Sequence, residues 1–278
     1  MSRRAESSSP LPDRPRRPLP PLDGERIAEE APRFAVETVQ ETGSTNSDLL
    51  QGAREQQPPR PLLRAAGHQT AGRGRHGRRW FSSAGNALLF SLAVPMAAAE
   101  SRIAAATLAC GVGAAEALRA VGAAVLLKWP NDLLLDGRKL GGVLCELAVD
   151  ALGRRTLVIG VGVNLRLEAG TRDSIGQPAA ALEETSAAGV TREGLIAAMA
   201  MAIHAALQLY EAQGFLPLQP RFMSLFAHRD AVVDLLELGV RAASGRALGV
   251  DGDGRLLLQT DQGLRVCSSG EVSLRPRR

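Results

Sequence analysis

A run of glycines and arginines between two apolar stretches most constrains how this chain can fold. The run reads Gly72-Arg73-Gly74-Arg75-His76-Gly77-Arg78-Arg79-Trp80. Glycine lets the backbone approach a ligand closely, and arginine presents a planar set of donors that fits carboxylate or phosphate. The order matches neither the P-loop nor the glycine-rich fingerprint of dinucleotide-binding folds. The run therefore predicts a mobile loop that clamps an anion, and the alternative is a solvated basic loop.

Strands are expected on both sides of this loop, over residues 62–69 and 87–94, because both stretches are apolar and short. A helix should begin at Ser44 or Thr45, which are good N-caps, and end near Glu55. These patterns predict an α+β domain over residues 34–230, in which helices back a mixed β-sheet. Further strands are expected over 34–41, 125–128, 133–135, 139–149 and 156–165, and further helices over 101–121, 191–210 and 216–226.

The two ends of the chain differ from this pattern. From Val232 onward, five short strand-like stretches follow at close intervals, which predicts a small separate β-barrel domain over residues 231–278. Residues 1–33 are rich in proline, arginine and serine, and predict a disordered tail. A nucleic-acid-binding arm is the alternative for this tail, which is too short for the three packed helices of a helix-turn-helix domain.

The net charge of +4 is concentrated at the two termini and in the arginine loop. A protein with a basic face large enough for duplex DNA would not show this distribution, so nucleic acid is an unlikely partner. Cys110, Cys145 and Cys267 stand alone in the sequence, as expected in a reducing cytosol. We expect a cytoplasmic protein, because no apolar run reaches the length of a membrane span and no secretory signal is evident.

Lys128 ends an apolar strand and precedes Trp129-Pro130, where a surface charge is not needed. It is either solvated or held there for an anion, whereas Lys139 by itself is more typical of a surface charge. Asp132 and Glu146 lack a tight metal-ligand spacing, so no metal cage of protein side chains is predicted. The lone His204 is typical of an ordinary core or surface residue.

Four segments occur in an order that resembles the biotin–protein ligase family, the catalytic module of bacterial biotin ligase/repressors. They are GSTN (43–46), QTAGRGRHGRRW (69–80), KWPNDLLLDGRKLGGVLCE (128–146) and VIGVGVNL (158–165), and the terminal GEVSLR is also similar. The resemblance covers roughly residues 36–275. It implies the class II synthetase-like biotin–lipoate ligase fold, followed by a small SH3-like β-barrel.

The resemblance implies a two-step reaction. Biotin and ATP give biotinyl-5′-AMP and pyrophosphate, and the biotinyl group then passes to a lysine of a biotin carboxyl carrier protein. Magnesium is expected to arrive with ATP. Such a reaction gathers negative charge, so it needs cations around the reacting oxygens more than a general base. By resemblance, the catalytic residues are Lys128, Arg73 and Arg75.

The resemblance also implies the binding residues. Biotin would be bound by Ser44, Thr45, Asn46, Gln69, Arg73, Gly74, Arg75 and Lys128. ATP and the adenylate would be bound by Gly72, Arg73, Arg75, Arg78, Trp80, Lys128, Asn131, Lys139 and Asn164. From spacing alone, Ser44, Thr45 and Asn46 are explained equally well as a helix cap.

Two alternatives remain open. A lipoate- or octanoate-transferring relative would share the fold, although the arginine run argues against it. A biotin-responsive DNA-binding repressor is disfavoured, because no helix-turn-helix is recognised.

The arginine run has His76 where the family often has arginine, which removes one positive charge from the clamp near neutral pH. A homodimer is possible.

Overall fold

A computed structural model describes residues 20–96, 103–168, 177–237, 240–268 and 272–276. Its larger sheet has seven strands in the order β1-β2-β3-β7-β6-β5-β4, with β1 and β2 parallel and the other neighbours antiparallel. The predicted mixed sheet is therefore confirmed. The strands are β1 (Ala35–Thr42), β2 (Leu62–Gln69), β3 (Ala87–Met96), β4 (Leu126–Lys128), β5 (Asp132–Leu135), β6 (Arg138–Val149) and β7 (Arg155–Asn164).

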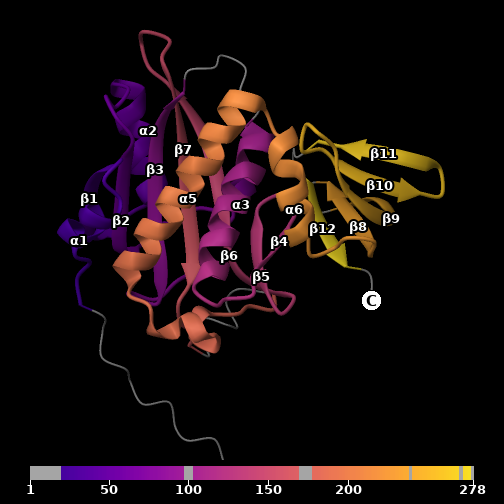
Figure 1. Cartoon of the computed structure of the whole chain (residues 1–278), viewed down its shortest axis with the longest axis horizontal. Helices are drawn as coiled ribbons and strands as arrows, with labels where there is room; N and C mark the ends of the chain where they lie inside the picture. The colour runs from indigo at the N-terminus through magenta and orange to yellow at the C-terminus, as the bar shows by residue number, and fades with distance from the viewer. Residues whose placement is uncertain (1–19, 97–102, 169–176, 238–239, 269–271, 277–278) are drawn as a thin grey trace, which may run out of the picture.

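Helices cover both faces of this sheet (Figure 1). Along β3, Phe90 and Leu92 point into the main core, which also holds residues of α3 (Ile103–Ala120) and α5 (Arg192–Gln213). Ala93, the residue after Leu92, faces the other side, where it packs with Leu49 and Leu50 of α2 (Thr45–Glu55). Alternate side chains of a strand point to opposite faces, so a nearly continuous apolar strand such as β3 needs cover on both sides.

The helices α3 and α5 cross closely at Gly113. A Cβ atom at this position would lie 2.5 Å from the carbonyl oxygen of Ala202, so the contact requires glycine. Contrary to the prediction from the sequence, both helices are long and apolar enough to cross a membrane by length and composition. In the fold they are mostly buried, because they form the core layer over the sheet.

The folded part of the chain begins nearer the N-terminus than predicted, because helix α1 (Gly24–Glu30) falls inside the expected tail. Asp23 caps it by accepting from the Arg26 amide at 3.1 Å, and Ile27 is fully buried. Arg192 at the start of α5 donates to the carbonyl oxygen of Pro20. One buried isoleucine and one cap are weak signals within a proline-rich stretch. Residues 1–19 lie outside the described part of the chain.

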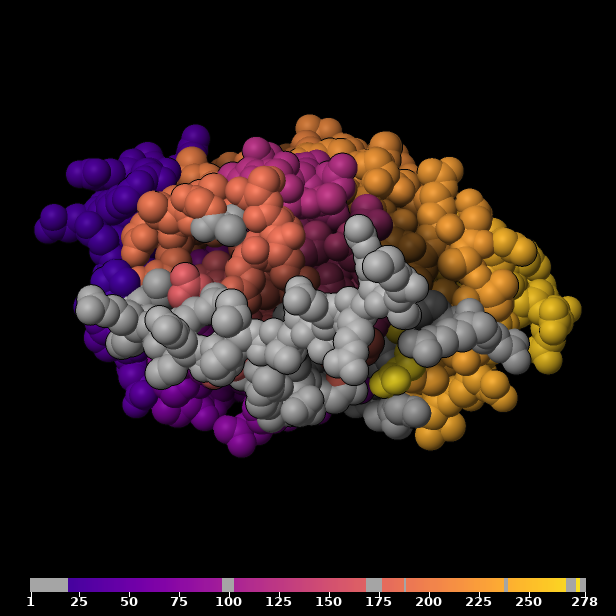
Figure 2. Space-filling view, turned by 90° about the horizontal axis from the view of Figure 1, so that it is seen from below, coloured from indigo at the N-terminus to yellow at the C-terminus, as the bar shows by residue number. Residues whose placement is uncertain are grey.

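The C-terminal strands form a five-stranded antiparallel sheet in the order β11-β10-β9-β8-β12, in agreement with the predicted small SH3-like domain. This sheet and α1 lie at opposite ends of the molecule (Figures 1 and 2). The sheet contacts the larger part of the chain: Trp129 donates from Nε1 to the Gly254 oxygen at 3.2 Å, and one hydrophobic core includes residues of both parts. The elements are η4 (Leu216–Leu218), α6 (Gln219–Leu225), β8 (Val232–Glu237), β9 (Val240–Val250), β10 (Leu256–Thr260), β11 (Gly263–Cys267) and β12 (Val272–Pro276).

Two buried histidines predict that the fold weakens in mild acid. Burial lowers the pKa of His204 and of His228, and the nearby charges of Arg33 and Lys128 respectively lower each further. The unfolded chain therefore binds more protons than the folded one below the ordinary histidine pKa of about 6.5. We expect the melting temperature to hold at neutral pH and to fall as the pH drops from about 6.5 toward 5. Melting curves of wild type and His204→Gln across this range test the prediction. The melting temperature of the variant should fall by less than that of wild type, and an equal fall would show that His204 does not contribute to the acid effect.

Candidate functional site

The start of α2 forms a polar wall at the end of β2. Gln69 accepts at Oε1 from both the amide and the hydroxyl of Thr45, at 2.7 and 2.9 Å. The Thr45 hydroxyl also lies 2.8 Å from that of Ser91 on β3. Ser44 caps the helix by accepting from the Ser47 amide at 3.4 Å. The helix cap and the polar wall are therefore the same residues, so the two interpretations of this motif are compatible.

This bonding pattern gives Gln69 a direction. Because two donors occupy its Oε1 atom, its Nε2 atom is the donor left for a ligand, and it has no partner among the described residues. A group that binds there must offer a hydrogen-bond acceptor. This end of the site is neutral, because Ser44, Thr45 and Gln69 carry no charge.

The opposite end of the site is cationic. Asp132 at the start of β5 lies between two lysines, with its carboxylate 3.4 Å from Lys128 Nζ and 2.7 Å from Lys139 Nζ. Burial raises the pKa of the Asp132 carboxyl, but the charges of Lys139 and Lys128 outweigh that effect, and the pKa lies below its usual value. Two lysines therefore share one carboxylate, and one positive charge remains.

The arginine run forms a short hairpin between β2 and β3. Gly74 donates to the Arg78 oxygen at 2.7 Å, and Trp80 donates to the Gly72 oxygen at 2.9 Å. Arg75, near the tip, is within electrostatic range of Asp132; burial lowers the pKa of its guanidinium, while Asp132 raises it. Arg75 thus adds a second positive charge to the end of the site that holds Lys128 and Lys139.

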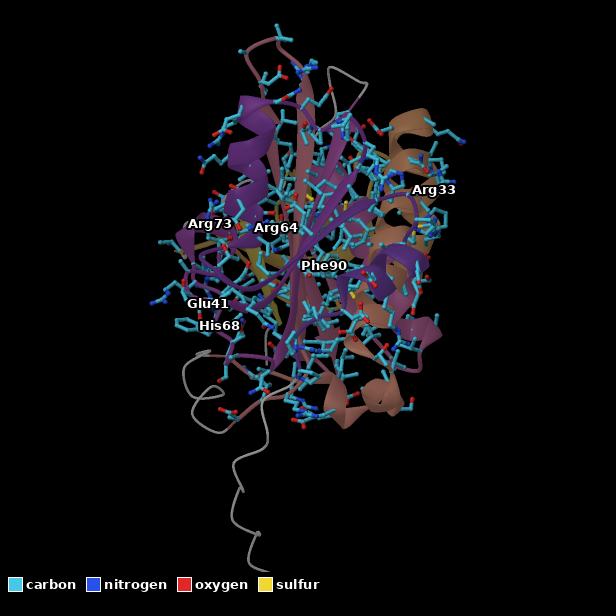
Figure 3. All side chains as sticks on the ribbon, turned by 90° about the vertical axis from the view of Figure 1, so that its left-hand side faces the viewer. Arg33, Glu41, Arg64, His68, Arg73 and Phe90 are labelled. Carbon is cyan, nitrogen blue, oxygen red and sulfur yellow. The ribbon has the colours of Figure 1, made fainter. Side chains whose placement is uncertain are left out.

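Arg73 was expected to bind the anionic part of the ligand, but it pairs with a carboxylate of the protein. Its guanidinium donates from Nη2 to Glu146 Oε1 at 3.0 Å and from Nη1 to the Ser47 hydroxyl at 3.3 Å. Figure 3 shows Arg73 on the side of the sheet where α2 lies. Arg73 is therefore neutralised at the polar end of the site, whereas Arg75 serves the cationic end.

These groups enclose one cavity of about 500 Å³, lined by residues from both domains. Of the predicted site residues, the structure brings all except Gly72 to its lining. Gly72 is buried, and a Cβ there would lie 2.9 Å from the Trp80 oxygen, so it closes the base of the hairpin. The residues on the lining are Ser44, Thr45, Asn46, Gln69, Arg73, Gly74, Arg75, Arg78, Trp80, Lys128, Asn131, Lys139 and Asn164.

Two of these residues have structural bonds as well. Asn131 donates from its side chain to the Val143 oxygen at 3.0 Å, and Asn164 donates to the Ala180 oxygen at 3.0 Å. Their side-chain amides hold the backbone around the cavity.

Sequence reasoning missed several lining residues. Asp132 was considered only as a metal ligand, and Ser91 lies on a strand with no motif of its own. Gly160 and Gly162 lie within the VIGVGVNL segment, which carried the resemblance without a role for either glycine. Arg275 reaches the cavity from β12 in the C-terminal sheet. Its signal was the terminal GEVSLR segment, but docking of the two parts could not be predicted from the sequence.

Comparison with known proteins agrees with this geometry. Residues 38–164 match the Biotin/lipoate A/B protein ligase family, and residues 235–275 match the Biotin protein ligase C terminal domain. The bifunctional ligase/repressor BirA of Salmonella typhimurium is 35% identical over 261 residues, which are 93% of this chain and 80% of that protein. The chain belongs to the biotin protein ligase family. The predicted function, biotin protein ligase, is thereby confirmed.

Other biotin protein ligases extend the comparison. The biotin--[acetyl-CoA-carboxylase] ligase of Mycobacterium tuberculosis is 32% identical over 243 residues, covering 85% of this chain and 88% of its own. The biotin protein ligase of Aquifex aeolicus, solved in complex with biotin and ATP, superposes with a TM-score of 0.73 at 26% identity. It covers 87% of this chain and 99% of its own. The ligase fold thus includes the C-terminal sheet that carries Arg275.

Proposed function

We propose that this chain activates biotin with ATP to biotinyl-5′-AMP and then transfers the biotinyl group to a lysine of a biotin carboxyl carrier protein domain. The observation that carries this proposal is the polarity of one cavity. Its neutral end offers the Gln69 donor, and its other end holds Lys128, Lys139 and Arg75 around Asp132. Biotin has a neutral ureido group at one end and a carboxylate at the other, which matches this arrangement.

In the first step, a biotin carboxylate oxygen attacks the α-phosphorus of ATP. The bond from that phosphorus to the bridging oxygen breaks, and pyrophosphate leaves. Both reacting groups are anionic, so Lys128, Lys139 and Arg75 lower the barrier by stabilising the charge that accumulates between them. Asp132 keeps the two lysines together at fixed distances, which prevents their mutual repulsion from spreading them apart.

In the second step, the amine of the carrier lysine attacks the acyl carbon. The amine gives up its proton to solvent, the bond between the acyl carbon and the phosphate oxygen breaks, and AMP leaves. The anhydride must be kept from water until the carrier arrives, so the hairpin around Arg75 is placed to cover it. The carrier of acetyl-CoA carboxylase is the partner we propose, as the name of the Mycobacterium tuberculosis relative indicates.

The nucleotide would lie beside Trp80, Asn131, Asn164 and Arg275 on the lining. Magnesium neutralises phosphate charge when it accompanies ATP. Among the residues that the structure describes, no three His, Cys, Asp or Glu side chains converge, and Asp132 is already paired with two lysines. Phosphate oxygens and water would therefore supply most of its ligands.

A competition assay tests this function. The protein is incubated with ATP, a purified carrier domain and an equal mixture of biotin, lipoate and octanoate, and the mass of the carrier is measured. We expect only the biotinyl adduct, on one lysine, and only when ATP is present. A lipoyl or octanoyl adduct would assign the chain to a different acyl group, and an unmodified carrier would overturn the proposal.

Trp80 gives a sharper prediction for nucleotide binding. Its ring lies against Gly162 on β7, where an added Cβ would be 2.8 to 3.1 Å from the ring atoms. Gly162→Ala should displace the ring and raise the KM for ATP about tenfold, with a smaller change in the Kd for biotin. The matched control is Gly52→Ala on the exposed side of α2, where a Cβ meets nothing within 4 Å. Equal KM values for ATP in the two variants would show that Trp80 is not near the nucleotide.

A further inference from the structure

Glu146 on β6 touches two lining residues without lining the cavity itself. Its Oε2 accepts from the Asn46 side chain at 2.5 Å, and its Oε1 accepts from Arg73 at 3.0 Å. Both carboxylate oxygens are therefore committed, one to α2 and one to the hairpin. The side chain is 27% exposed, so the ion pair is partly shielded from solvent.

Arg73 completes a three-way junction. Its second nitrogen donates to the Ser47 hydroxyl of α2 at 3.3 Å. One guanidinium thus joins the hairpin to both β6 and α2, and a planar fork of donors is suited to such bridging. The hairpin's own bonds, Gly74 to Arg78 and Trp80 to Gly72, are internal and do not attach it to α2.

The charge of Glu146 matters as well as its bonds. Four arginines lie within residues 72–79, and their mutual repulsion opposes a closed hairpin. Glu146 cancels the charge of the arginine nearest the neutral end of the cavity. Arg75 keeps its charge, within electrostatic range of Asp132.

We propose that Glu146 is a positioning residue: by holding Arg73 and Asn46 with its two oxygens, it keeps the arginine hairpin closed over the bound adenylate. It acts through Arg73 and does not touch reacting atoms. The inference rests on the proposed function for its ligand, but the contacts of Glu146 with Arg73 and Asn46 join protein groups alone and can be tested without a ligand.

Limited trypsin digestion of the ligand-free protein tests closure directly, because the hairpin carries four arginines. In Glu146→Gln, cleavage within residues 73–79 should be at least about fivefold faster than in wild type. The matched control is Glu116→Gln, which removes a comparably exposed carboxylate paired with Arg221 away from the cavity. Equal cleavage rates in the two variants would overturn the proposal. If Glu146→Gln does not fold, Arg73→Gln replaces it, with the same expected cleavage at the remaining arginines.

A double-mutant cycle tests the functional consequence. Arg73→Gln, Glu146→Gln and the double variant are compared for the dissociation rate of biotinyl-AMP and for single-turnover adenylation at saturating biotin and ATP. We expect each single variant to release the adenylate about tenfold faster, and the double variant to be no worse than either. Glu146→Gln, which does not line the cavity, should keep its adenylation rate within about threefold of wild type. Additive effects would show that Arg73 and Glu146 act separately. A wild type that forms no adenylate would instead reject the proposed function, and the trypsin result would still stand.

Discussion

Lys128→Gln is expected to slow formation of biotinyl-AMP by roughly 100- to 1000-fold, because losing one such preorganised contact costs about 3–4 kcal/mol of transition-state stabilisation. Glutamine keeps the length of the side chain but removes the positive charge. The side chain of Lys128 is 18% exposed, so its charge acts in a partly shielded site. Rapid-quench measurement of adenylate formation at saturating substrates isolates this step.

The fold should tolerate this change. Asp132 retains its 2.7 Å ion pair with Lys139, so no buried carboxylate is left without a cation. Arg138→Gln on the neighbouring strand β6 is the matched control, because Arg138 pairs with Glu184 at 2.8 Å and does not line the cavity. Its adenylation rate should stay within about twofold of wild type. A near-normal rate in Lys128→Gln would make this lysine a bystander.

Arg75→Ala should weaken the binding of biotinyl-AMP by about 10- to 100-fold and the binding of free biotin by much less. The adenylate adds a phosphate for Arg75 to hold, and a hydrogen bond to a charged group contributes about 1.5–3 kcal/mol. Arg75 lies with Asp132 at the cationic end, away from the neutral wall at Gln69. Stopped-flow dissociation of the two ligands from wild type and variant measures the difference.

The same variant should leak its activated intermediate. Released biotinyl-AMP reacts with exposed lysines, so an added protein without a carrier domain should become labelled by Arg75→Ala and not by wild type. Arg79→Ala is a suitable comparison within the hairpin, because Arg79 lies over Phe81 and donates to the Thr70 oxygen at the hairpin's base. Equal effects on biotin and biotinyl-AMP, with no stray labelling, would mean that the hairpin does not guard the intermediate.

Local signals in the sequence predicted the elements around the site closely. The helix cap at Ser44 placed the start of α2, and the apolar run before the hairpin placed β2 over Leu62–Gln69. The pair Asp136-Gly137 is typical of a tight turn between the strands predicted over 133–135 and 139–149, and both residues adopt positive φ angles in the structure. Each of these features depends on a few neighbouring residues, which is why the sequence alone was sufficient.

Features that depend on distant residues were not predictable. From its spacing alone Lys139 was typical of a surface charge, and only the resemblance placed it at the nucleotide, because its pairing with Asp132 requires the register between β5 and β6. Glu146 meets Arg73 and Asn46 only after α2, the hairpin and β6 have packed together. Helix α1 was missed because its order comes from burying Ile27 in the main core rather than from its own composition.

The most direct test of the central claim is biotin-dependent exchange of labelled pyrophosphate into ATP. This exchange reports reversible adenylate formation in the cavity and requires no carrier protein. We expect exchange with wild type only when biotin is added, and its loss in Lys128→Gln but not in Arg138→Gln. Exchange that is absent with biotin, or that lipoate supports equally well, would contradict the account.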